Sequence, residues 1–121
     1  MSTLWGNPTG ETNVADGIDW VMTGRHGGLR VKSRVAREAG IVDRLKELRD
    51  MGQRRRKRTR FGPYFQSRHW WFEKEHSWSL AVLLLPQFFS EEQQEAARDT
   101  AKAYYPEGFT LITGEEIPKE D

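Results

Sequence analysis

The stretch from Phe61 to Phe89 constrains the fold most, because it holds most of the large apolar side chains of the chain. It contains three of the five tryptophans, five of the six phenylalanines and the long apolar run Leu80–Leu85. Burial of large aromatic and aliphatic side chains supplies most of the free energy that stabilises a small domain. We therefore expect the core to be built from this stretch and the other elements to pack against it.

Length and composition limit the kinds of protein that this chain can be. Its 121 residues predict a single domain over residues 1–121, with a basic loop at 49–62 and a polar tail at 115–121. The absence of cysteine excludes disulfides, thiolate metal sites and cysteine nucleophiles, and it fits a reducing compartment. No signal-peptide pattern opens the chain, and no apolar run approaches the roughly 20 residues of a membrane span. We expect a cytoplasmic protein with no membrane contact.

Charge is distributed unevenly, although the net charge is only +1. Residues 1–61 carry 14 Lys and Arg against 7 Asp and Glu, a balance of +7. Residues 62–121 carry 5 against 11, a balance of −6. This polarity predicts a basic face that meets an acidic partner and an acidic face elsewhere on the molecule.

The N-terminal third has the pattern of a β-meander. Asp16-Gly17 is a favoured two-residue hairpin turn, and it separates residues 11–15 from 18–23. A second turn at 24–28 precedes a third alternating segment over residues 29–34. In the second segment the predicted core-facing side chains are Ile18, Trp20 and Met22. In the third, the outer face is predicted to be cationic through Arg30, Lys32 and Arg34.

Residues 33–51 show helical spacing. Apolar side chains recur every three or four positions and predict one buried helix face, formed by Val35, Ala39, Val42, Leu45 and Leu48. Gly40 is expected to divide the segment, and Gly52 to end the second part. The run Gln53–Arg60 cannot bury itself and is predicted to be a solvated loop.

The second half contains one clear helix and one ambiguous region. Residues 64–76 fit a strand or a helix start, and the run at 80–85 fits a helix or a buried strand. Ser90 and Gln93 form a capping box, so we expect a helix from 91 to Tyr104 or Tyr105, ended by Pro106. Residues 109–113 are predicted to be a short last strand. Together these elements predict an α+β fold, an N-terminal three-stranded antiparallel meander packed against two or three helices, with an Arg-rich loop insertion.

Several short islands of the sequence resemble a small domain family of uncharacterised function that is found in phage, plasmid and integrative-element proteins. The islands are Leu4-Trp5-Gly6, Gly17-Ile18-Asp19-Trp20-Val21, His26-Gly27-Gly28, Trp71-Phe72-Glu73, Trp78-Ser79-Leu80-Ala81, Tyr105-Pro106 and Leu111-Ile112-Thr113-Gly114-Glu115. The resemblance implies a mobile-element context and no particular chemistry. Against this pattern the segment 49–62 is an insertion, and His69 and His76 lie outside the shared islands.

The Arg-rich insertion is the strongest functional signal. Six cations in seven positions repel one another, and contact with the anions of a partner relieves that repulsion. Arginine also suits bidentate pairing with phosphate or carboxylate. The alternative interpretation is a solvated tip that aids solubility. The residues predicted to bind the partner are Arg49, Arg54, Arg55, Arg56, Lys57, Arg58 and Arg60, together with Arg30, Lys32 and Arg34.

Two weaker motifs carry alternative interpretations. The turn Arg25-His26-Gly27-Gly28 could present backbone N–H groups to an anion or ligand, although a strand-to-strand turn also needs glycine. His69, Glu73 and His76 would share one face of a helix, as zinc ligands do, but the order of residues is not the metalloprotease motif. We predict no metal and no cofactor.

These features favour a non-enzymatic binding protein of a phage or other mobile element. We expect it to dock its basic face on an acidic surface of a host protein or nucleoprotein complex and to inhibit that target, as anti-defence proteins of the anti-CRISPR kind do. The first alternative is direct, sequence-tolerant binding of DNA or RNA with strong salt dependence. The second is an enzyme that uses His26 with Glu73 or Asp19.

Overall fold

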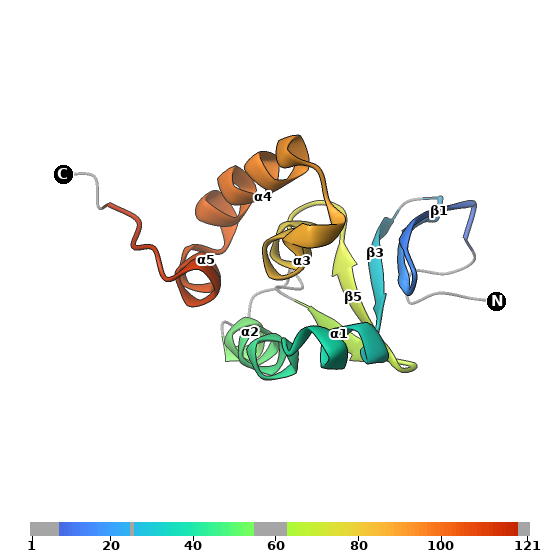
Figure 1. The fold of residues 1–121 in the computed structure, drawn as a ribbon, viewed down its shortest axis with the longest axis horizontal. Helices are drawn as coiled ribbons and strands as arrows, with labels where there is room; N and C mark the ends of the chain where they lie inside the picture. Colours follow the sequence, from blue (N-terminus) through green and yellow to red (C-terminus); the bar gives the residue numbers. More distant parts are fainter. Residues whose placement is uncertain (1–7, 25, 55–62, 119–121) are drawn as a thin grey trace.

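The chain forms a five-stranded antiparallel sheet with helices on one face (Figure 1). The computed structural model describes residues 8–24, 26–54 and 63–118, but for residues 52–54 it describes the backbone only. The strand order is β1-β2-β3-β5-β4. The strands are β1 (Gly10–Ala15), β2 (Ile18–Met22), β3 (Gly27–Lys32), β4 (Tyr64–Gln66) and β5 (His69–Glu73). The predicted meander is confirmed, and the region that the sequence left open adds β4 and β5 beside β3.

The first hairpin turns at Asp16-Gly17, as the sequence predicts, with Gly17 at a φ of 85°. A bulge at Val14 shifts the register between Asn13 and Ala15. Of the predicted core positions in β2, Ile18 is fully buried and Trp20 half-buried, whereas Met22 is 38% exposed. The prediction was wrong for Met22 because it lies at the end of the strand, opposite Gly27, which offers no side chain to pack against.

Two helices follow β3. They are α1 (Ser33–Ala39) and α2 (Val42–Arg54), and Gly40 separates them in the left-handed conformation at a φ of 72°. Val35 and Leu45 are buried as predicted, but Ala36 takes the inward place expected of Ala39. The expected stop at Gly52 was wrong, since the helix continues to Arg54.

The apolar run of the central stretch forms a helix, α3 (Trp78–Leu84), which is followed by a 3₁₀ turn η1 (Pro86–Phe88). Ser90 and Gln93 make both hydrogen bonds of the predicted capping box, at 3.2 and 2.9 Å, and open α4 (Glu91–Tyr104). Tyr104, the last residue of α4, is 50% exposed.

The expected strand at 109–113 is instead a helix, α5 (Pro106–Thr113). Pro106 occupies the first helical turn, where the missing N–H costs nothing. Gly108 allows α5 to approach α2 closely, because a Cβ there would lie 2.9 Å from a Leu48 methyl carbon. Arg44 on α2 also donates a hydrogen bond to the carbonyl of Ile112 at 3.1 Å.

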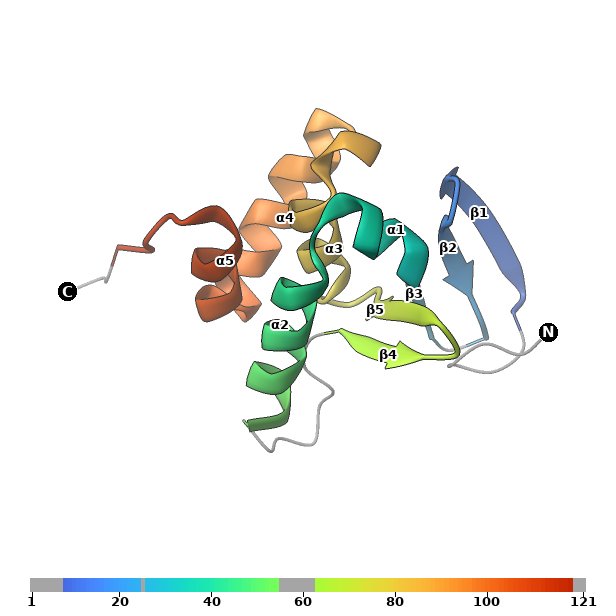
Figure 2. The ribbon, with the colours of Figure 1, turned by 60° about the horizontal axis from the view of Figure 1, so that its bottom comes forward.

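All the helices lie on the same side of the sheet, and the core fills the space between the two layers (Figures 1 and 2). The sheet contributes five buried side chains to this core: Ile18, Leu29, Val31, Trp70 and Phe72. The register places Trp71 on the opposite face, where its indole donates to the carbonyl of Gln66 at 2.9 Å and its side chain is also buried. The helix-free face of the sheet carries the polar groups described next.

Candidate binding surface

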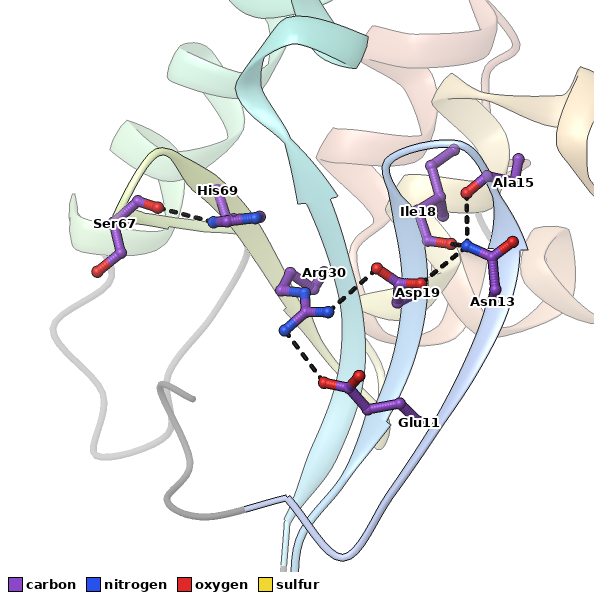
Figure 3. A network of polar contacts seen from close by, with 8 residues as sticks. All are labelled: Glu11, Asn13, Ala15, Ile18, Asp19, Arg30, Ser67 and His69. Atoms are coloured by element: carbon purple, nitrogen blue, oxygen red, sulfur yellow. Dashed lines mark hydrogen bonds and ion pairs between the residues drawn. The ribbon is translucent and has the colours of Figure 1, made fainter. Parts of the chain in front are cut away.

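Arg30 is held by carboxylates of its own sheet (Figure 3). Its guanidinium lies 3.1 Å from Asp19 on β2 and 3.3 Å from Glu11 on β1. Asn13 donates to the second oxygen of Asp19 at 2.9 Å. The side chains of Arg30 and Asp19 are only 17% and 20% exposed, so this network is partly desolvated. Arg30 therefore neutralises acids of the sheet, and its charge is not free for a partner as the strand pattern suggested.

The other two predicted cations near β3 differ from each other. Arg34 is the second residue of α1, and it pairs with Asp16 at 3.2 Å and Glu38 at 3.4 Å. Hydrogen bonding to Asp16, with a smaller contribution from Glu38, raises the pKa of Arg34 above its ordinary value. Lys32 is exposed and lies opposite His69, and no described carboxylate pairs with it. Only Lys32 of the three predicted strand cations thus presents an uncompensated charge.

The His26-Gly27-Gly28 motif serves the backbone of the sheet. Both glycines belong to β3, and only His26 lies in the turn, where its N–H donates to the hydroxyl of Thr23 at 3.1 Å. A Cβ on Gly28 would lie 1.9 Å from the carbonyl oxygen of Phe72 on β5, and one on Gly27 would lie 2.7 Å from that of Val21. The strands therefore require glycine for close packing, which favours the structural interpretation of this motif. Arg25 lies outside the described residues.

Most of the predicted Arg run falls in the part of the chain that the structure leaves undescribed. Arg54 ends α2, and its side chain is among the undescribed ones, as are all of Arg55, Arg56, Lys57, Arg58 and Arg60. The described chain stops at Arg54, the last residue of α2, and resumes at the buried Pro63, one residue before β4. The C-terminus of α2 and the start of β4, both seen in Figure 2, are the described parts of the chain on either side of the run.

That side carries further cations, some of which the sequence analysis missed. Arg68 lies in the two-residue turn between β4 and β5, where Ser67 and Arg68 have φ values of 55° and 63°. Its carbonyl accepts a hydrogen bond from the N–H of Ser33 at 3.0 Å, which fixes the turn against the start of α1. Arg37, one helical turn further on, reaches the hydroxyl of Ser33 at 3.5 Å. We call Arg37, Arg49 and Arg68 the basic corner.

Arg68 was missed because the acidic balance of the second half hid it. The signal that could have found it is the sequence Gln66-Ser67-Arg68-His69 between two aromatic segments, which is the length of a tight hairpin. Arg37 and Arg68 are exposed, and no carboxylate within the described ranges pairs with either. Among the carboxylates of the described residues, Arg49 pairs with its exposed neighbour Asp50 alone, at 3.5 Å. Such a surface pair contributes little stabilisation, so the corner remains cationic.

The acidic residues of the second half lie elsewhere. Helix α4 carries four exposed carboxylates, Glu91, Glu92, Glu95 and Asp99. It lies on the far side of α3 from α1 and α2 (Figure 1). The charge polarity of the sequence therefore becomes a spatial separation between α4 and the basic corner.

The histidines and Glu73 do not form the helical face that zinc binding would need. His69 is in β5, and its Nδ1 lies 2.7 Å from the carbonyl oxygen of Ser67. His76 lies in the turn between β5 and α3, and its ring stacks on that of Tyr104 with 3.6 Å between the ring centroids. No group of three or more His, Cys, Asp or Glu suited to a metal occurs within residues 8–24, 26–54 and 63–118. Glu73 does lie near His76 and His26, so a carboxylate and two imidazoles share this end of the sheet.

The half-buried Glu73 gives a pH-dependent prediction. Burial, more than any neighbouring charge, raises the pKa of Glu73 above its ordinary value of 4.5. Ionisation of Glu73 therefore lowers stability progressively as the pH rises from the ordinary value to this higher pKa, and the full penalty is present above it and absent well below the ordinary value. We expect Glu73→Gln to unfold at a slightly higher temperature than the wild type at pH 7, and at an equal temperature below about pH 4. Thermal unfolding across this range checks it; the exposed Glu95→Gln is the control, and an advantage that does not vary with pH would contradict it.

Comparisons with known proteins place the chain in a family without a described activity. No helix among the described residues is long and apolar enough to cross a membrane. No curated protein matches the sequence, and no solved structure matches the fold. A family model described as a domain of unknown function (DUF7007) matches residues 1–121. The chain therefore belongs to this uncharacterised domain family over its whole length.

Proposed function

We propose that the protein is a non-enzymatic binding protein of a phage or other mobile element. It docks its basic side on an acidic surface of a host protein or nucleoprotein complex in the host cytoplasm and inhibits that target. The observation that carries the proposal is the separation of charge. Arg37 and Arg68 lie where the start of α1 meets the β4–β5 turn, and Arg49 on α2 lies over Trp70 of β5. The exposed acids of α4 lie on the other side of α3.

This arrangement suits docking at one end better than wrapping. A long nucleic acid that followed the surface around the molecule would meet the carboxylates of α4 and be repelled. A partner that contacts only the side formed by α1, α2 and β4 would meet the basic corner, and we assign the Arg run to the same contact. The resemblance to domains of mobile elements supports the proposed context, because such elements encode small inhibitors of host proteins.

The test is a quadruple variant, Arg54, Arg55, Arg56 and Arg58 each to Ala, used as bait in host lysate. We expect the wild type to retain a protein partner after nuclease treatment, and the variant to lose it, because four cations near the contact are removed. The same variant should lose its effect in phage-infected cells. The matched control neutralises four charges on the other side: Glu91, Glu92 and Glu95 to Gln with Asp99 to Asn.

The outcomes separate the alternatives. A quadruple Arg variant that keeps both its partner and its activity in cells would refute the proposal. Recovery of nucleic acid alone, lost on nuclease treatment or at higher salt, would instead favour a free nucleic-acid-binding protein.

A further inference from the structure

An aromatic ring is exposed beside the basic corner. Phe65 is 47% exposed, on the edge strand β4, and its ring lies 5.1 Å from that of Trp70. The other large apolar side chains exposed among the described residues are Met22, Phe88 and Tyr104, which lie at the end of β2, in η1 and at the end of α4.

Phe65 and the cations share a single support. Trp70 is buried and contacts Phe65, while the guanidinium carbon of Arg49 lies 5.9 Å from its ring. Arg68 follows Phe65 by three residues, at the turn that joins the two strands. Arg37 lies beside that turn, because Ser33 is hydrogen-bonded both to the Arg37 guanidinium and to the carbonyl of Arg68. The buried Trp70 therefore contacts both the exposed ring of Phe65 and the guanidinium group of Arg49. Two more unpaired arginines, Arg37 and Arg68, lie at the β4–β5 turn next to it.

This combination discriminates between acidic partners. An acidic protein surface offers carboxylates to arginine, but it covers an exposed phenyl ring only where an apolar side chain also lies at the matching place. A single-stranded nucleic acid offers phosphates together with unstacked bases, and bases stack on aromatic side chains without sequence preference. In a duplex the bases are already stacked on one another, so a ring on a sheet edge gains little from it.

We infer that the basic corner and Phe65 bind single-stranded nucleic acid, with Phe65 stacked on a base and Arg37, Arg49 and Arg68 on the phosphates. The inference rests on the proposed function and narrows it: the target is a nucleoprotein complex. The basic corner and Phe65 meet an exposed single strand of this complex, while the Arg run contacts its protein part, which is the partner retained after nuclease treatment. The bound strand contacts only this part of the surface, because the carboxylates of α4 would repel a strand that extended around the molecule.

The test measures binding of fluorescent 20-nucleotide oligo-dT and oligo-U, and of a hairpin duplex, by the full-length protein. We expect Phe65→Ala to weaken single-strand binding by about 5- to 150-fold, and Phe65→Tyr to keep it, since a stacked base is worth about that much. Arg68→Ala should weaken binding and lower the salt dependence by about one phosphate contact. Phe88→Ala, which removes an exposed ring away from the corner, is the matched control, and circular dichroism melts confirm that each variant is folded.

Two results would overturn the inference: no binding of either single strand by the wild type at low salt, or equal binding by Phe65→Ala and the wild type. These are distinct from failure of the proposed function. A protein partner that survives nuclease, is lost from the quadruple Arg variant and is kept by Phe65→Ala would leave the proposed function standing and refute the single-strand contact.

Discussion

Gly28→Ala should lose a large share of its folding stability, although it adds one methyl group to the middle of a sheet. The added carbon would lie 1.9 Å from the carbonyl oxygen of Phe72 and 2.8 Å from the Cα of Glu73. Both atoms belong to the backbone of β5, so no side-chain rotation relieves the clash, and β3 and β5 must separate. Overpacking of a core commonly costs about 1–3 kcal/mol, and we expect a loss at or above the top of that range.

The measurement is thermal and urea unfolding. A loss of about 3 kcal/mol is a large share of the 5–15 kcal/mol that stabilises a typical domain, and it should lower the melting temperature by about 10 °C or more. Gly10→Ala is the matched control, because Gly10 also lies in a strand and an added Cβ there meets nothing within 4 Å. If the two variants were equally stable, the structural interpretation of the His26-Gly27-Gly28 motif would be wrong and an anion-binding role would regain support.

The elements that the sequence predicted are those whose signals are local. Asp16-Gly17 produces its hairpin, Gly40 divides α1 from α2, and Ser90 with Gln93 opens α4. Each depends on residues only a few positions apart, so the pattern contains the whole physical cause. The α+β fold class and the N-terminal meander follow from these elements.

The errors arise where distant parts of the chain decide. Residues 109–113 contain an aromatic and β-branched residues, which favour a strand, yet they form α5 because Gly108 lets this segment pack on Leu48 of α2. The central stretch could be divided into β4, β5 and α3 only once β3 was available as the neighbour of β5. Local propensity gives no information on either contact.

The candidate surface was predicted only in part for the same reason. The Arg run and Lys32 could be proposed from composition, but pairing across strands determines which cations remain free. Arg30 and Arg34 meet carboxylates from β1, β2, the first turn and α1, whereas Arg68 meets none within the described residues. The exposure of Phe65 likewise depends on β4 being the outermost strand.

Arg30→Ala tests this distinction between a structural and a binding cation. Its removal leaves Asp19, only 20% exposed, with Asn13 as its remaining hydrogen-bond donor. Loss of one partner from a buried pair costs about 3–5 kcal/mol, and because this pair is partly solvated we expect about 2 kcal/mol. Lys32→Ala, on the same strand and the same face, should change stability by less than about 0.5 kcal/mol.

Partner binding should be weakened more by Lys32→Ala than by Arg30→Ala, because a free cation contributes to the contact and a neutralised one does not.

A double-mutant cycle isolates the pairing of Arg30 with Asp19. Arg30→Ala should destabilise the Asp19→Asn background much less than it destabilises the wild type, since the buried charge that needs Arg30 is gone. Urea unfolding gives the stabilities, and capture of the partner from host lysate gives the binding. Equal stability of Arg30→Ala and Lys32→Ala would show that the network on the helix-free face does not hold Arg30, and would return Arg30 to the binding surface. If Arg30→Ala instead lowers stability and leaves partner binding unchanged, the binding surface is limited to the cations that the sheet leaves unpaired.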